Sequence, residues 1–188
     1  MKKYTLKISI IVIIISLVIT SCASDAENEF LITKDQVGLL TPTTHLDELE
    51  TIFAKDSVSE SAYEGELRYA STERFEIFDK TGAPLLEITP AKDSIHTIRS
   101  IKIISPKYYT KSGITVNSTF KDIKKQYPIS SIDNLWTSVV IHVNDLNAHF
   151  TIDKKNLDPK FLKNTLYDVT ENDIPETAPI KYFMIGWY

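Results

Sequence analysis

The stretch "SVVIHVNDLNAHFTID" (138–153) decides the fold, because it predicts a β-hairpin with a defined register. A turn around 144–147 brings Val143 opposite Ala148. In this register His142 and His149 lie opposite each other on one face. A slip by one residue would mix the faces, so this register, or one shifted by two residues, is favoured. The other face is then entirely apolar, comprising Val139, Ile141, Val143, Ala148, Phe150 and Ile152.

Other segments predict further strands. Residues 74–88 contain two apolar runs around the turn 79–82, whose glycine can adopt positive φ. Apolar residues also alternate in 96–105, and 62–70 is a further candidate strand. The apolar segment 180–188 predicts a closing strand, so the sheet is expected to be mainly antiparallel.

Two short helices are predicted 74 residues apart, in "TTHLDELETIF" (43–53) and "STFKDIKKQY" (118–127). In both, apolar residues recur at spacings of 3 and then 4, which places them on one helical face. Each starts with a pair typical of a capping box, Thr44 with Asp47 and Thr119 with Asp122.

These elements predict an α+β domain, with two short helices packed on a mainly antiparallel β-sheet. The matching helices favour a tandem helix-plus-strands repeat, although two unrelated amphipathic helices would give the same local pattern. A brief additional helix is expected to open at Asp158-Pro159 and to run to about Leu166.

The first 21 residues have the pattern of a secretory signal peptide. Three lysines precede a short apolar run from Ile8 to Ile19. Twelve helical residues span about 18 Å, less than the hydrocarbon core of a bilayer. An uncleaved short anchor is the alternative interpretation.

The segment Ile19–Cys22 resembles the bacterial lipobox. The resemblance implies that Cys22 receives a diacylglycerol and an acyl chain and becomes the mature N-terminus. Two or more chains suffice for stable anchoring. Ala23 does not resemble the aspartate that retains lipoproteins in the inner membrane, so an outer-membrane address in the cell envelope is preferred.

Composition excludes several kinds of partner and chemistry for the mature chain. Cleavage before Cys22 would leave 167 residues and change the formal charge from −4 to −7. This acidity argues against nucleic acid as a partner, because a phosphate backbone attracts Lys and Arg. Cys22 is the only cysteine, so once it is acylated no disulfide, cysteine–metal site or thiol catalysis remains.

The lipobox, the polar tether that follows it and the helix-plus-strands pattern together resemble small bacterial lipoproteins. These are the lipoproteins with the β-lactamase-inhibitor-like repeat, including those of the outer-membrane assembly type. The resemblance rests on "VGLLTPTTHLDELETIF" (37–53) and "SGITVNSTFKDIKKQY" (112–127). Those repeats usually have a second helix and a following glycine, whereas Ala54 and Pro128 follow here. The resemblance implies a binding or scaffolding role and no particular functional residue.

The predicted organisation has three parts. Residues 1–21 form the signal peptide, and residues 22–35 form the lipidated N-terminus and a polar tether. Residues 36–188 form one α+β domain, divisible into repeats at 36–105 and 106–188.

No local motif in the chain predicts an enzyme. The five glycines are never closer than 17 residues, which excludes a glycine-rich phosphate loop. Neither a G-x-S-x-G elbow nor an H-E-x-x-H pair is present.

The predicted cross-strand pair of His142 and His149 is the best candidate site. Two imidazoles with Cβ atoms about 5 Å apart would hold zinc if Asp145 or another carboxylate supplied a third ligand. A polar cross-strand pair without metal explains the same pattern, and no resident cofactor is predicted.

Aromatic residues give a second set of candidates. Tyr108 and Tyr109, within "PKYYTK" (106–111), interleave with basic residues as on some glycan- or peptide-binding surfaces. Core or sheet-edge packing is the default expectation for Trp136, Trp187 and Tyr188. If Tyr108, Tyr109 and Trp187 are exposed together, they form a candidate binding surface.

The sequence therefore predicts a lipid-anchored envelope protein whose non-enzymatic domain binds another protein or acts as a scaffold. An envelope hydrolase acting on peptide or glycan is the alternative from a different class. A toxin-immunity lipoprotein is a further alternative that shares the binding role.

Overall fold

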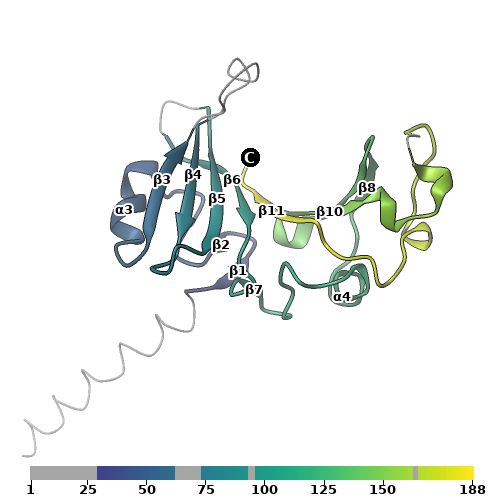
Figure 1. Ribbon diagram of the computed structural model, residues 1–188, viewed down its shortest axis with the longest axis horizontal. Coiled ribbons are helices and arrows are strands. Elements are labelled where there is room, and N and C mark those ends of the chain that lie inside the picture. The colour runs from purple at the N-terminus through teal and green to yellow at the C-terminus, as the bar shows by residue number, and fades with distance from the viewer. Residues whose placement is uncertain (1–28, 62–72, 93–95, 163–164) are drawn as a thin grey trace, which may run out of the picture.

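The computed structural model describes residues 29–61, 73–92, 96–162 and 165–188 (Figure 1). Its main feature is an eight-stranded sheet in the order β3-β4-β5-β6-β11-β10-β9-β8, with every neighbouring pair antiparallel. The strands are β3 (Ser57–Ser61), β4 (Arg74–Phe78), β5 (Pro84–Pro90), β6 (Ile98–Ile103), β8 (Ser131–Asn134), β9 (Ser138–Val143), β10 (Ala148–Asp153) and β11 (Tyr182–Gly186). The predicted α+β class is thus confirmed.

The sheet is built from two similar halves. In the first, a 3-10 turn (Leu46–Glu48) and α3 (Leu49–Ile52) precede strands β3 to β6. In the second, α4 (Phe120–Gln126) precedes strands β8 to β11. The last strands of the halves, β6 and β11, pair with each other (Figure 1). The first half therefore contributes strands β3 to β6 in sequence order, and the second half contributes β8 to β11 in the reverse order.

The 138–153 hairpin has the predicted register. Val143 pairs with Ala148 and His142 with His149. All six residues of the predicted apolar face are at most 1% exposed. The 3-10 turn Asn144–Leu146 and a left-handed Asn147 (φ 51°) connect the strands. Asparagine tolerates this conformation better than most residues, so the local sequence suits the turn.

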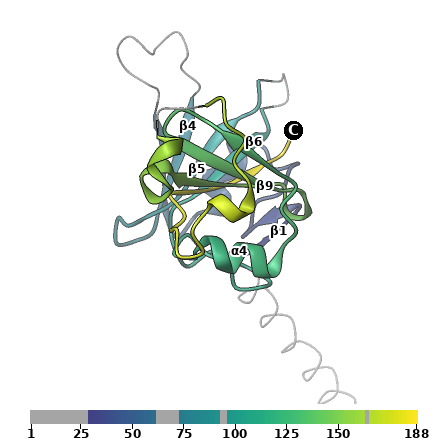
Figure 2. The same cartoon turned by 90° about the vertical axis from the view of Figure 1, so that its right-hand side faces the viewer.

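The helices and a small second sheet cover one face of the large sheet. Leu49 of α3, with Phe120 and Ile123 of α4, joins the same core as the inward side chains of the strands. The small sheet consists of β1 (Leu31–Thr33), β2 (Gln36–Val37) and β7 (Tyr109–Thr110). Figure 2 shows β1 and α4 on the same side of the main sheet.

Several predicted boundaries need correction. The tether was expected to extend to residue 35, but β1 pairs with β2 and β7, and Ile32 is fully buried. The folded domain therefore begins before residue 36. The helix expected from Asp158 to Leu166 is a single 3-10 turn, Pro159–Phe161, capped by the Asp158 carboxylate. Two more 3-10 turns, Lys154–Asn156 and Glu171–Asp173, follow β10 and precede β11.

The two predicted capping boxes differ in outcome. Asp122 accepts hydrogen bonds from the Thr119 backbone N–H and hydroxyl, both at 2.8 Å, as predicted. In the first half the box lies one residue later, because the Glu48 carboxylate accepts from the His45 N–H at 3.0 Å. Thr44 is instead buried, and its hydroxyl accepts from the Thr41 N–H.

The predicted strand at 62–70 lies outside the described residues, as do the predicted signal peptide and Cys22. Within the ranges that the structure describes, no helix has the length and apolar character needed to cross a bilayer.

Candidate functional site

One face of the main sheet, which no helix or strand of the described ranges covers, carries a continuous row of side chains that crosses all eight strands. Residues directly opposite each other in antiparallel strands point to the same face. We call this face the open face. From β3 to β8, the row consists of Ser59, Glu76, Glu87, Lys102, Met184, His149, His142 and Ser131.

The row lies opposite the core. Its neighbours along the strands, such as Ile77, Ile101 and Phe150, are fully buried on the other side. The six central members of the row are half-buried, whereas Ser59 and Ser131 at the two sheet edges are exposed. The strict alternation in β9 and β10 forces this separation of polar and apolar faces.

In the first half, the open face is charged but internally balanced. Glu76 and Glu87 lie directly opposite each other, an arrangement that is unfavourable for like charges. Each has a cation nearby: Arg74 lies 4.0 Å from Glu76, and the Lys102 ammonium lies 3.2 Å from Glu87. These partly exposed pairs offset the repulsion and contribute little net stability.

In the second half, the side chains of Asp133, His142 and His149 form a hydrogen-bonded network. His142 Nε2 lies 2.8 Å from Asp133 Oδ2, and His142 Nδ1 lies 2.8 Å from His149 Nδ1. A carboxylate only accepts, so the neutral His142 carries its proton on Nε2 and accepts at Nδ1. His149 Nδ1–H is then the donor. Both ring nitrogens of His142 are engaged, which leaves neither to act as a general base.

The electrostatic environment keeps His149 neutral. Burial lowers the pKa of His149, and the neighbouring His142 lowers it further, while Asp133 opposes the effect. His149 therefore adds no positive charge to the open face at neutral pH.

The exposed residues Tyr182 and Tyr188 flank this hydrogen-bonded network. Gly186 pairs with Ser100, so a side chain at 186 would point to the open face. The ring of Tyr188 occupies that space: a Cβ on Gly186 would lie 2.5 Å from Tyr188 Cε2. The Tyr188 and His149 ring centroids are 6.2 Å apart. Tyr182, 42% exposed, lies on the same face, with the Lys102 ammonium 5.1 Å from its ring centroid.

The His142–His149 pair forms as the hairpin predicts, but the geometry does not carry the zinc hypothesis further. The two Nδ1 atoms bind each other, and Asp133 contacts the far nitrogen of His142. The described part of the chain holds no group of three His, Cys, Asp or Glu side chains placed to bind a metal ion.

The predicted aromatic surface is not formed. Tyr108 and Trp187 are only 2% and 8% exposed, whereas Tyr109 is 38% exposed. Tyr108 packs edge-to-face on Phe30, and the Trp187 indole donates to the Lys34 carbonyl at 3.0 Å. Both rings are therefore structural. Trp136, expected in the core or at a sheet edge, is exposed in the turn between β8 and β9.

Sequence reasoning missed the first half of the row and both flanking tyrosines as parts of one face. The available signal was alternation, because Glu87 and Lys102 each interrupt a run of apolar residues in their strands. Alternation assigns a residue to one of two faces of its own strand. It does not say which strands will be neighbours.

No family model matches the chain, and no curated protein matches it in sequence. Among solved structures, the chain is similar to the crystal structure of the uncharacterized protein yfeY from Escherichia coli. The match has a TM-score of 0.55 at 12% sequence identity and covers 83% of this chain and 99% of that one. At this identity the similarity concerns the fold alone.

Proposed function

We propose that this protein is a lipid-anchored cell-envelope protein whose open face binds another protein. The observation that supports this function is the open face, which no element of the described residues covers, with its continuous row and the exposed Tyr182 and Tyr188. Seven spacings of about 4.8 Å give this face a width of about 34 Å, the scale of a protein–protein interface.

The chemistry of the open face suits a protein partner. Tyrosine, methionine and arginine are enriched at protein interfaces, and this face presents Tyr182, Tyr188, Met184 and Arg74. The half-buried row limits the side-chain entropy lost on binding, because packing already restricts its side chains. Glu76 and Glu87 have nearby cations, so a partner need not neutralise them.

The proposed anchor rests on the sequence around Cys22. An acylated Cys22 would precede Glu29, the first described residue, by seven positions. Even fully extended, seven residues reach at most about 25 Å, so the domain would stay close to the membrane surface. The resemblance to β-lactamase-inhibitor-like repeat lipoproteins supports the same binding role.

The hydrolase alternative has one observation in its favour, the Asp133–His142 contact, which is of the kind that orients a catalytic histidine. The other nitrogen of His142 contacts His149 instead of a hydroxyl group, so the binding role is preferred. A toxin-immunity role differs only in the partner and is covered by the same experiment.

Site-specific photocrosslinking in cells tests the proposal. A photoreactive residue at Thr151 or Tyr182, both on the open face, is expected to yield one discrete crosslinked protein. The matched control is Lys125, an exposed residue of α4 on the opposite side of the sheet. Absence of a discrete product from both open-face positions, or the same product from Lys125, would contradict the proposal.

A further inference from the structure

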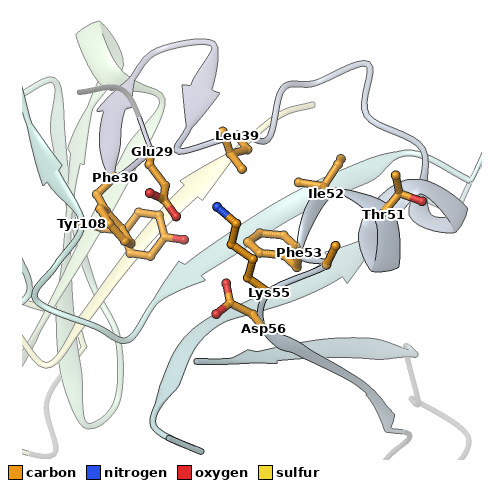
Figure 3. A pocket seen from close by; sticks show the side chains of 10 residues that line it. Glu29, Phe30, Leu39, Thr51, Ile52, Phe53, Lys55, Asp56 and Tyr108 are labelled. Carbon is orange, nitrogen blue, oxygen red and sulfur yellow. The ribbon is translucent and has the colours of Figure 1, made fainter. Parts of the chain in front are cut away.

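A cavity of about 440 Å³ lies between the start of β1, the end of α3 and Tyr108 (Figure 3). Its volume falls in the range of small-molecule sites. It shares no lining residue with the open face. The lining side chains that matter here are Glu29, Phe30, Phe53, Lys55, Asp56 and Tyr108.

Tyr108 is the unusual member of this lining. The residue is 98% buried, yet its hydroxyl faces the cavity in Figure 3. Among the described residues, this hydroxyl has no hydrogen-bond partner. Burial raises the pKa of the phenol, and the charges of Asp56 and Glu29 raise it further, so the group stays protonated. The hydroxyl opens onto the cavity, so it can form a hydrogen bond with a ligand bound there.

The charged groups around Tyr108 point into the same space. Figure 3 shows the carboxylates of Glu29 and Asp56 and the ammonium of Lys55 on the cavity side. Within the described ranges, none of the three is in a salt bridge. Two carboxylates and one ammonium give the cavity lining one net negative charge. The nearby Lys107 also interacts with Glu29 and Asp56, but its ammonium is paired with Asp79 at 2.8 Å. The negative charge of the lining favours a cation and opposes an anion.

The wall of the cavity is fixed by close packing. Phe30 and Tyr108 stack edge-to-face with ring centroids 5.2 Å apart. Gly38 has φ 58°, and a Cβ there would collide with the Glu29 carbonyl and lie 3.0 Å from Tyr108 Cε1. Residue 38 therefore has to be glycine for the Glu29 backbone and the Tyr108 ring to keep these positions.

We infer that this cavity binds an organic cation, a primary ammonium attached to an apolar group. The ammonium donates to the Glu29 and Asp56 carboxylates and to the Tyr108 oxygen, while the apolar group contacts Phe30 and Phe53. Aromatic faces add further attraction for a cation. This chemistry is shared by free amines and by the N-terminal residue of a peptide. A zwitterionic amino acid suits the site less, because Lys55 alone would face its carboxylate.

Isothermal titration of the full-length protein in detergent tests this inference with two cationic probes, phenethylamine and the peptide amide Phe-Ala-Ala-NH2. We expect binding of at least one probe. N-acetylation of the peptide removes its charge and is expected to abolish peptide binding. Zwitterionic L-phenylalanine is expected to bind more weakly than phenethylamine. The amine and peptide arms distinguish the two sources of the ligand.

Variants assign the binding to this cavity. Tyr108→Phe keeps the ring and removes the hydroxyl, and Asp56→Asn removes one charge. Each is expected to weaken binding by about tenfold, since a hydrogen bond to a charged group is lost. The matched controls are Tyr109→Phe, the exposed neighbouring tyrosine, and Asp47→Asn, an exposed carboxylate outside the cavity. These controls are expected to bind as the unsubstituted protein does.

A second measurement is independent of variant folding. In the unsubstituted protein, amide chemical shifts perturbed by the probe are expected to cluster at Phe30, Phe53 and Tyr108. Three results would overturn the inference: no binding of either cation at millimolar concentration, equal binding of the acetylated peptide, or unchanged affinity in both Tyr108→Phe and Asp56→Asn. Shift changes confined to residues away from the cavity would also overturn it.

Discussion

The Nδ1 atoms of His142 and His149 lie 2.8 Å apart, joining the imidazoles of β9 and β10 in one hydrogen bond across the open face. The rings are nearly perpendicular, at 86°, with centroids 4.7 Å apart. This contact requires one unprotonated nitrogen in the pair. Full protonation of both rings would replace the hydrogen bond with the repulsion of two cations.

The His149 environment predicts a pH-dependent stability. The pKa of His149 is lowered in the folded state from 6.5, chiefly by burial. Between the folded and unfolded pKa values of His149, the unfolded chain binds more protons than the folded chain. The contribution of His149 to the free energy of unfolding is therefore complete above about pH 6.5. It is lost as the pH falls toward the folded pKa. Chemical denaturation from pH 8 to pH 5 should show this fall in the free energy of unfolding.

The control for this measurement is His149→Phe, which removes the titrating group while keeping a planar ring. The groups that face His149 are His142, with Asp133 behind it, Met184 and Tyr188. The variant should show a flatter profile over the same range. An equally steep fall in His149→Phe would assign the pH dependence to another group.

Gly38 and Gly113 provide a matched pair at positive φ. Both residues are in the left-handed region, at 58° and 83°. A Cβ at Gly113 meets open space, whereas one at Gly38 collides with the Glu29 backbone. Gly113→Ala should therefore cost about 1 kcal/mol of unfolding free energy from backbone strain alone. Gly38→Ala should cost more by at least about 1 kcal/mol, because backbone must move. Equal costs in denaturant titrations would contradict the close packing of residue 38.

Neighbouring positions on β10 test the assignment of its two faces. Phe150 is fully buried against Phe183, with ring centroids 4.5 Å apart, while Thr151 lies on the open face. Phe150→Ala should destabilise the domain by about 3–5 kcal/mol through the cavity it leaves. Thr151→Ala should cost less than about 1 kcal/mol. Thermal or urea unfolding measures both, and a comparable loss in Thr151→Ala would mean that the open face is covered.

The capping interaction at the start of the first helical segment distinguishes two adjacent acids. Glu48 accepts from the His45 N–H, whereas Asp47 was the residue expected from the sequence. Glu48→Ala should lower the free energy of unfolding by about 0.5–1 kcal/mol, because an N-terminal donor loses its acceptor. Asp47→Ala should have the smaller effect. A larger loss of stability in Asp47→Ala than in Glu48→Ala would instead support the capping box predicted at Thr44.

Lipid anchoring is tested by Cys22→Ser. A serine cannot form the thioether, so the variant should retain its signal peptide and lose incorporation of labelled palmitate. Fractionation should find the unsubstituted protein with the outer membrane. Labelling of the Cys22→Ser variant would contradict the lipobox interpretation.

Local patterns predicted the parts of this fold that depend on near neighbours. The 138–153 register follows from alternation and a short turn, because a slip by one residue would mix the apolar and polar faces. Both helical segments and the turn at Gly82, with φ 83°, follow from spacing and residue type. The capping box at the first helical segment shows the limit of such local prediction. The pairs Thr44 with Asp47 and His45 with Glu48 are adjacent and chemically similar, and the structure has the second pair.

The candidate sites depend on contacts between distant segments. Lys102 and Met184 meet because β6 pairs with β11, a contact across more than eighty residues with no signature in either strand. Tyr108 and Tyr109 are adjacent in sequence, yet one is buried beside Phe30 and the other is exposed. The sequence by itself determined the hairpin, the helices and the polar character of each strand face, because these arise from local periodicity. Only the tertiary structure decided which faces join into one row and which tyrosine faces a cavity, because burial depends on what the rest of the chain places alongside.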